Sequence, residues 1–379
     1  MVKAPVEIEI EGHDGEARAG VLHTPHGLVK TPTFMPVGTK GTVKGLTPGD
    51  LRSAKVGVVL GNTYHLYLRP GAELVREADG LHGFTGWKGP MLTDSGGYQV
   101  FSLAHKRKIS EKGVEFTSVY DGSSHFFTPE LTTKVQEDLG ADIAMVLDEC
   151  PPASASREYH VDSLRRTARW AKRCKEAHSR RDQALFGIVQ GGLHPDLRKE
   201  SLERTLELDF PGYAVGGLSV GEPREAMLEM LALVAPQLPA GKPRYFMGIG
   251  DPVGILQVVD LGVDMFDCVL PTRLARHGSA LTSGGRINLK NASYRRGLGP
   301  LDPECSCEAC SADYSRAYLS HLVRENELLA HRLVTLHNVH FISELCRRAR
   351  AAILEGRYEE FVKAWISRYA GGQPLGAVR

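Results

Sequence analysis

A carboxylate followed closely by cations marks the segment from Asp264 to Arg276. A short, mainly apolar stretch carries Asp267 and reaches Pro271, which has no backbone N–H for a strand ladder, so the strand is predicted to end near Pro271. Residues 273–296 hold six Lys or Arg and no Asp or Glu, although the net charge of the whole chain is only +1. A carboxylate beside a local basic stripe indicates chemistry on an anionic polymer. The simpler alternative is an Asp that ends a strand and pairs with an arginine.

Three of the seven cysteines fall in one short loop, Cys305-Ser306-Cys307-Glu308-Ala309-Cys310. Three thiolates and one histidine make a closed tetrahedral zinc site, which stabilises structure and leaves no position for substrate. His337 is the preferred fourth ligand because it opens a polar pair within an apolar, periodic run, but spacing alone leaves His331 and His340 open. The alternative is an unpaired cysteine loop with scattered surface histidines. We predict one structural Zn²⁺, with the ligands Cys305, Cys307, Cys310 and His337.

The composition is that of a soluble globular protein, with 24 % charged and 42 % hydrophobic residues in a chain of 379. No apolar run approaches the roughly 18 residues that a membrane helix needs. Residues 1–20 are polar and do not resemble a signal peptide. Seven cysteines, an odd number, argue against a secreted disulfide framework. We therefore expect a cytoplasmic protein with reduced thiols and no membrane partner.

A short apolar run followed by Gly, Asp, Asn or Gln recurs along the first three-quarters of the chain, with helical patterns between several of the runs. Eight such repeats predict an α/β fold of the (β/α)8 TIM-barrel type, with a doubly wound open sheet as the main competitor. The predicted strands are residues 33–37, 56–60, 91–92, 143–147, 186–189, 213–215, 245–247 and the stretch that contains Asp267.

The predicted organisation has two parts. Residues 1–279 form the catalytic barrel, and residues 280–379 form a zinc-binding subdomain with closing C-terminal helices. Two β-like runs around Asp121-Gly122 predict a hairpin inserted near residues 108–127, after the third strand. Predicted helices cover residues 131–139, 161–171, 195–208, 222–233 and 252–261.

In a TIM barrel the C-terminal ends of the strands meet at one mouth, where catalytic groups collect. Five residues fall at such ends, although Asp and Gly also simply terminate strands: Asp94, Asp148, Gln190, Gly217 and Asp267. Tyr98 follows a Gly-Gly pair and is predicted either to stack on a planar ring or to pack in the core. The cations between Arg165 and Lys175 crowd one predicted helix, which favours a solvated outer face over a phosphate-binding surface. No nucleotide-binding loop of the Walker type is present.

Together these motifs resemble the tRNA-guanine transglycosylase (queuine tRNA-ribosyltransferase) family, and most closely its bacterial type. The matching segments run in family order along nearly the whole chain: residues 93–99, 148–150, 187–192, 215–218 and 264–273, and the cysteine cluster with His337-Asn338. The resemblance implies a (β/α)8 barrel with a zinc subdomain near the C-terminus. It also implies exchange of guanine at wobble position 34 of tRNAs with a G-U-N anticodon for a 7-deazaguanine.

The resemblance assigns roles to the mouth residues. Asp267 is the implied nucleophile that forms a covalent ribosyl-enzyme intermediate, and Asp94 is the general acid/base. Asp148 is expected to bind the donor edge of a guanine-like base, while Gln190 and Gly217 address its O6 edge. The same pocket is expected to include Ser95, Tyr98, Cys150, Leu218 and Met247. Arg273 and Arg276 are expected to contact nucleotides that flank the target base.

Subclass features point to the base preQ1 (7-aminomethyl-7-deazaguanine) as the substrate. Cys150 and Val220 resemble the bacterial preQ1 enzymes rather than the eukaryotic queuine enzymes. Tyr314, Tyr318 and His321 fall where the bacterial family places homodimer contacts, so a homodimer is expected. A non-catalytic tRNA-binding partner subunit and a barrel glycosidase that acts on sugars are the competing functions.

Overall fold

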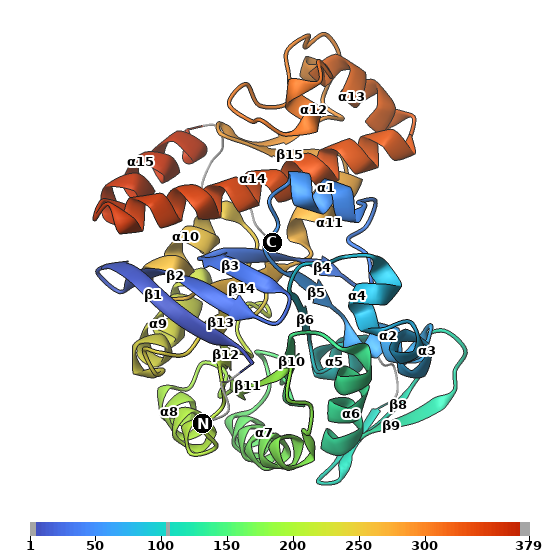
Figure 1. Cartoon of the computed structure of the whole chain (residues 1–379). Helices are drawn as coiled ribbons and strands as arrows, with labels where there is room; N and C mark the ends of the chain where they lie inside the picture. Colours follow the sequence, from blue (N-terminus) through green and yellow to red (C-terminus); the bar gives the residue numbers. More distant parts are fainter. Residues whose placement is uncertain (1–4, 104–106, 372–379) are drawn as a thin grey trace.

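A computed structural model describes residues 5–103 and 107–371 of the chain (Figure 1). Its centre is a closed barrel of parallel strands in the order β10-β11-β12-β13-β14-β4-β5-β6. The ring closes where β6 pairs with β10 and where β14 pairs with β4, so the TIM barrel is confirmed and the open sheet is wrong. The strands are β4 (Thr33–Gly38), β5 (Val59–Gly61), β6 (Met91–Thr93), β10 (Ile143–Met145), β11 (Ala184–Val189), β12 (Tyr213–Val215), β13 (Arg244–Phe246) and β14 (Met265–Cys268).

Helices on the outside of the barrel begin where the sequence supplies caps. Thr128 accepts a hydrogen bond from the N–H of Leu131 at the start of one helix, with Pro129 in its first turn. Asp251 caps another helix in the same way through the N–H of Gly254. The five predicted helices are present: α6 (Pro129–Leu139), α7 (Arg157–Ala177), α8 (Pro195–Leu206), α9 (Arg224–Val234) and α10 (Pro252–Asp260). Four of them match the predicted bounds closely, whereas α7 extends well beyond the predicted 161–171 at both ends. Shorter helices after the first three barrel strands are α1 (Pro48–Ser53), α2 (Thr63–Leu68), α3 (Ala72–Glu77), α4 (Gly80–Thr85) and α5 (Gly97–Leu103).

Two local predictions were wrong. The last barrel strand ends at Cys268, not near Pro271, because Leu270 begins the helix α11 (Leu270–Arg276). Proline fits the first turn of a helix, where its missing N–H costs nothing. The insertion is a three-stranded antiparallel sheet, not a hairpin: β7 (Arg107–Ser110), β8 (Gly113–Thr117) and β9 (Ser124–Phe127). Asp121-Gly122 does turn the chain between β8 and β9, as predicted.

An antiparallel sheet that the sequence did not reveal precedes the barrel. It comprises β1 (Glu7–Asp14), β2 (Ala17–Thr24) and β3 (Gly27–Thr31), in that order. Half or more of the residues in β3 and every second residue in the middle of β1 are exposed, so these strands lack the apolar runs that predict buried strands. The sheet packs against α10 and against the long helix α14 (Leu328–Leu354), as the front of the view in Figure 1 shows.

The C-terminal part lies at the top of the view in Figure 1. It contains β15 (Ser279–Thr282), β16 (Gly285–Asn288), α12 (Glu308–Ser311), α13 (Arg316–Arg324), α14 and α15 (Tyr358–Ala370). The first half of α14 packs in a small apolar core with Leu289 and Leu319, whereas its second half packs in the main core of the barrel. Division of the chain at residues 279/280 stays a prediction, since α14 belongs to both cores. None of the described helices is long and apolar enough to cross a membrane.

The N-terminal ends of the barrel strands carry two buried carboxylates. Asp264, directly before β14, receives hydrogen bonds from Arg18 of β2 at 2.8 and 2.6 Å and from the N–H of Arg244 at 2.7 Å. Asp142, directly before β10, receives one from the N–H of Met91 at 2.8 Å and lies 2.9 Å from the ring nitrogen Nδ1 of His26. These contacts fasten the N-terminal sheet and the strand starts to one another.

Candidate active site

The C-terminal ends of five barrel strands bring the predicted mouth residues together. Asp94 follows β6, Asp148 lies shortly after β10, Gln190 follows β11, and Gly216-Gly217 follows β12. Asp267 lies near the end of β14. Because parallel strands of a barrel end at one rim, these side chains face a common space. Asp148 contacts Ser95 and Gln190 directly, and the charge of Asp267 acts on Asp94.

Asp267 is held through one oxygen. The hydroxyl of Tyr245 donates to Oδ1 at 2.6 Å, and the N–H of Gly248 donates to the same atom at 3.1 Å. Burial raises the pKa of Asp267 above its ordinary value, while these two hydrogen bonds oppose that rise. As a whole residue, Asp267 is half-buried by accessible surface.

Asp94 is held by three hydrogen bonds and has a strongly raised pKa. Its Oδ2 accepts from Asn62 Nδ2 at 2.6 Å, and its Oδ1 accepts from the N–H groups of Thr63 at 2.8 Å and Gly96 at 3.2 Å. Burial raises the pKa of Asp94 to about 7, and the negative charge of Asp267 adds to that rise. The charge of Asp267 therefore reaches Asp94, and a group with a pKa near neutrality can both donate and accept a proton.

Asp148 forms a buried polar cluster with two other predicted residues. Ser95 Oγ donates to Asp148 Oδ1 at 3.1 Å, and Gln190 Nε2 donates to Asp148 Oδ2 at 2.7 Å. Burial raises the pKa of Asp148 to about 6, against the effect of both hydrogen bonds. Gln190 Oε1 is buried with no hydrogen-bond partner among the described residues. An unpartnered amide oxygen in a pocket is a group that a ligand can satisfy.

The loop after β12 approaches Gln190 so closely that only glycine fits. A Cβ on Gly217 would lie 2.1 Å from Gln190 Oε1, and one on Gly216 would lie 2.9 Å from Gln190 Nε2. Gly217 also has a φ of +64°, in the left-handed region. A buried arginine that the sequence did not single out, Arg198, holds the loop by donating to the carbonyls of Gly216 at 2.7 Å and Gly217 at 3.1 Å.

The remaining predicted pocket residues surround this cluster. Met247 is half-buried, with its sulfur 3.4 Å from the Cβ position of Gly216, and Leu218 is buried. Burial raises the pKa of the Cys150 thiol to about 12, so the thiol stays protonated at neutral pH. The side chain of Tyr98 is 53 % exposed, so the alternative of core packing is wrong.

A rim of uncompensated cations borders the mouth. Arg273 and Arg276 project from α11, and Lys40 and Lys44 lie in the loop between β4 and α1. Burial lowers the pKa of Lys44, and the charges of Arg276, Lys40 and Arg273 lower it further. In the described parts of the chain no carboxylate forms an ion pair with any of these four cations. Such a rim attracts a polyanion.

The basic cluster on α7 is different, because most of its cations have acidic partners. Arg165 pairs with Glu200 at 2.9 Å, Arg169 with Glu111 at 2.6 Å and Arg173 with Glu130 at 2.7 Å. Arg166 pairs with the buried Glu149, which also accepts from Tyr159. The interpretation of this helix as a solvated outer face is confirmed for Arg165, Arg169 and Arg173, whereas it is wrong for Arg166, which turns inward to the buried Glu149.

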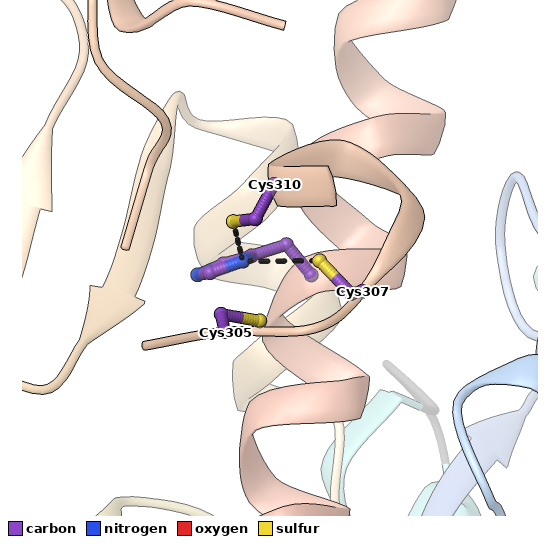
Figure 2. Close-up of side chains that lie close together, drawn as sticks. Cys305, Cys307 and Cys310 are labelled. Carbon is purple, nitrogen blue, oxygen red and sulfur yellow. Dashed lines mark hydrogen bonds between the residues drawn. The ribbon is translucent and has the colours of Figure 1, made fainter. Parts of the chain in front are cut away.

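A second site lies in the C-terminal part, where three thiols meet one imidazole (Figure 2). The ring nitrogen Nδ1 of His337 lies 3.4 Å from Cys307 Sγ and 3.3 Å from Cys310 Sγ, and Cys305 completes the group. A tetrahedron with Zn–S near 2.3 Å and Zn–N near 2.0 Å has S···N edges of about 3.5 Å, so the donor set and its spacing fit zinc. His337 Nε2 donates to the carbonyl of Leu281 at 2.6 Å, which fixes the tautomer that leaves Nδ1 free for a metal.

The other two candidate histidines do not belong to this group. His331 Nε2 lies 3.1 Å from Asn326 Oδ1, and His340 Nε2 lies 3.3 Å from Ser306 Oγ. A third group with potential ligand atoms, His26, His82 and Asp142, has nitrogen–oxygen distances of 2.9 and 3.4 Å. His82 Nε2 also lies 3.1 Å from the carbonyl of Gly89, which requires a proton on that nitrogen. This group is therefore a hydrogen-bonded cluster.

Sequence comparisons agree with this geometry. The family model described as Queuine tRNA-ribosyltransferase matches residues 14–371. A protein of Pelotomaculum thermopropionicum named queuine tRNA-ribosyltransferase is 56 % identical over 355 residues, which cover 94 % of this chain and 96 % of that protein. Proteins with the same name from Desulforamulus reducens and Fusobacterium nucleatum are 54 % and 52 % identical, over 97 % and 98 % of this chain and 100 % of each relative. The chain belongs to the queuine tRNA-ribosyltransferase family, whose members are tRNA-guanine transglycosylases.

Proposed function

We propose that this enzyme replaces guanine at wobble position 34 of G-U-N tRNAs with preQ1, through a covalent intermediate on Asp267. The observation that carries the proposal is the pair Asp94 and Asp267, two buried carboxyl groups at one barrel mouth, where burial raises both pKa values and the charge of Asp267 raises that of Asp94 further. Membership of the family supplies the tRNA and the small base as substrates.

The chemistry follows the logic of a retaining glycosidase. Ionised Asp267 attacks C1′ of the ribose, and the C1′–N9 electron pair leaves with guanine, which takes a proton from Asp94. Asp94, now ionised, removes a proton from the incoming base, whose N9 then attacks C1′ and releases Asp267. A pKa of about 7 for Asp94 suits both proton transfers at neutral pH. One glycosidic bond replaces another, so the reaction requires no ATP.

Base recognition is assigned to the polar cluster around Asp148. An ionised Asp148 accepts from N1–H and the 2-amino group of the base, with Ser95 holding one of its oxygens. Gln190 and the N–H of Gly217 address O6, and Leu218 contributes its carbonyl. Tyr98 and Met247 stack on the two faces of the base, which must first leave the anticodon stack. Cys150 lines the same pocket with a protonated thiol. The choice of preQ1 rests on the resemblance of Cys150 and Val220 to the bacterial enzymes.

The tRNA is assigned to the cationic rim. Arg273 and Arg276 read the nucleotides beside position 34, and Lys40 and Lys44 supply further charge for the phosphate backbone. The absence of paired carboxylates at this rim within the described chain supports the assignment, in contrast to α7. Electrostatic contact with phosphates predicts that binding weakens as salt increases.

Zinc is assigned to Cys305, Cys307, Cys310 and His337 as a closed, structural ion. When bound, it ties the cysteine loop to α14 and takes no part in base exchange. The protein is further proposed to act in the cytoplasm as a homodimer. The stacked rings of Tyr314 and Tyr318, with centroids 6.1 Å apart, would lie at the contact between subunits. A monomer at micromolar concentration in analytical ultracentrifugation would contradict the dimer.

The function is tested by incorporation of radiolabelled guanine into unmodified tRNA with a G-U-N anticodon, followed by a chase with preQ1. The wild type is expected to incorporate label that preQ1 then displaces, whereas Asp267→Asn incorporates none. Denaturing gels should reveal a covalent enzyme–tRNA species with the wild type only. Tight tRNA binding and a full zinc complement without incorporation would instead identify a non-catalytic partner subunit.

A further inference from the structure

We propose that Tyr245 is a positioning residue for the nucleophile: with the N–H of Gly248 it occupies Oδ1 of Asp267 and leaves Oδ2 to attack C1′. The inference rests on the proposed function, since it specifies the oxygen that forms the covalent bond.

The geometry of neighbouring strands places this contact. Tyr245 lies on β13, where it pairs in register with Met265 of β14, two residues before Asp267. Its side chain is 1 % exposed, and its hydroxyl lies 2.6 Å from Asp267 Oδ1. Two donors therefore converge on Oδ1, while no hydrogen bond from another of the described residues reaches Oδ2. A carboxylate fixed through one oxygen presents the other in a defined direction, which is how orientation accelerates a nucleophile.

The surroundings of Tyr245 keep it in the donor form. Burial raises the pKa of Tyr245 well above its ordinary value, and the charges of Asp267, Asp94 and Asp148 raise it further. The hydroxyl thus remains protonated over the whole working range of pH. Its hydrogen bond lowers the pKa of Asp267 against the effect of burial, so it keeps the nucleophile ionised.

The contact persists through both half-reactions. As the Oδ2–C1′ bond forms and the C1′–N9 bond breaks, Oδ1 becomes the carbonyl oxygen of a ribosyl ester and still accepts from Tyr245. When N9 of the incoming base attacks C1′, the C1′–Oδ2 electron pair returns to the carboxylate, whose charge Tyr245 again stabilises. Tyr245 keeps its own proton in every step.

The test compares the pH profiles of kcat/KM for guanine exchange in the wild type, Tyr245→Phe and Tyr213→Phe. Tyr213 is a matched control: it lies on the adjacent strand β12, is 1 % exposed, and its hydroxyl accepts from the N–H of Phe210 away from the carboxylates. Hydrogen bonds to charged groups shift pKa values by about one unit or more. In Tyr245→Phe the acidic limb of the profile should move about one pH unit higher, because Asp267 is harder to ionise. In Tyr213→Phe the limb should stay in place.

A second variant covers the case in which Tyr245→Phe does not fold. Replacement of Tyr245 by 3-fluorotyrosine keeps the size of the ring but makes the hydroxyl a stronger donor, so the acidic limb should move below that of the wild type. An unmoved limb in a folded, active variant would overturn the inference while leaving the proposed function intact. If the wild type itself exchanges no guanine, the proposed function is wrong. That result differs from an unmoved limb in an active variant, which contradicts only the role of Tyr245.

Discussion

The pKa values of aspartates are shifted in opposite directions at the two ends of the barrel. Asp142 and Asp148 flank the same strand, β10, and Asp264 lies three positions before Asp267 on β14. At the mouth, burial raises the pKa of Asp148 to about 6 and that of Asp267 above its ordinary value. At the other end, burial also acts to raise the pKa of Asp142, but hydrogen bonds from His82, the N–H of Met91 and His26 outweigh it and hold the pKa low.

The difference in pKa lies in the partners of these carboxylates. The carboxylates at the N-terminal end face cationic or ionisable groups, namely Arg18 and two histidines. Those at the mouth face neutral donors, which are two side-chain amides, two hydroxyl groups and backbone N–H groups. Ion pairing would fix the mouth carboxylates in the charged state and block proton transfer. The aspartates at the N-terminal end therefore stabilise the fold, whereas those at the mouth are less stabilising but can react.

The largest expected effect is on activity, and it distinguishes Asp267 on β14 from Asp264, which precedes that strand. Asp267→Asn should lower kcat for guanine exchange by at least about four orders of magnitude, because the amide is no nucleophile. Its melting temperature should equal or exceed that of the wild type. The measurement is single-turnover exchange alongside thermal unfolding. Residual exchange within tenfold of the wild type would remove Asp267 from its proposed role.

The second effect is on stability. Asp264→Asn should lower the free energy of unfolding by about 3–5 kcal/mol, because it leaves the buried Arg18 without its counter-charge. Denaturant unfolding measures the loss, and the folded fraction should keep the wild-type kcat. The double variant Arg18→Met/Asp264→Asn is the control, and it should recover part of the loss since no unpaired charge remains. Equal stability of Asp264→Asn and the wild type would contradict a stabilising role for the aspartates at the N-terminal end of the barrel.

A smaller loss is expected at Asp142. Asp142→Asn should destabilise the protein by about 1–3 kcal/mol at pH 7, since hydrogen bonds to a charged acceptor become bonds to a neutral one. The folded-state pKa of Asp142 is below its ordinary value, so its contribution is present above the unfolded pKa and is lost as the pH falls through the folded pKa. Unfolding curves at pH 7 and pH 4 should therefore show the gap between variant and wild type narrowing at the lower pH.

The smallest expected change in the free energy of unfolding is an increase. Asp94 has a folded-state pKa of about 7 against an ordinary value of 3.8, so the native state binds the additional proton and wild-type stability falls as the pH rises through that window. Asp94→Asn should thus stabilise the protein by about 1–2 kcal/mol at pH 8, with little gain at pH 5, while abolishing exchange. If Asp94→Asn were less stable than the wild type at both pH values, the hydrogen bonds of the Asp94 carboxylate would contribute more to stability than its desolvation costs.

Much of this arrangement could be predicted from the sequence, because it depends on local patterns. Apolar runs that end in Asp, Gln or Gly predicted the barrel strands and placed Asp94, Asp148 and Asp267 at one rim. The cysteine spacing predicted the metal ligands from one short loop. Spacing could not select His337 over His340, because residues three apart on a helix point only about 60° apart and the facing loop decides between them.

The partners of those residues could not be predicted. Tyr245 reads as one more apolar position of a buried strand, and its contact with Asp267 requires the register between β13 and β14. Asn62 and Arg198 act through elements far along the chain from the groups they hold. The N-terminal sheet was missed because only its middle strand is largely buried. Long-range pairing of polar groups leaves no periodic signal in the sequence.

The helix α14 has a consequence for how the molecule is made. Its Arg350 donates to the carbonyls of Gly20 and Thr31, its Asn338 donates to the carbonyl of Pro271, and its His337 lies in the metal cluster. Barrel closure likewise joins β14 to β4, from opposite ends of the chain. During synthesis on a ribosome, residues near 350 emerge long after the early strands. Until then, the seam where β14 meets β4 and the strands beside it stay uncovered. Because contacts so distant along the chain form slowly, nascent chains that stop before α14 are expected to expose this seam to chaperones and proteases.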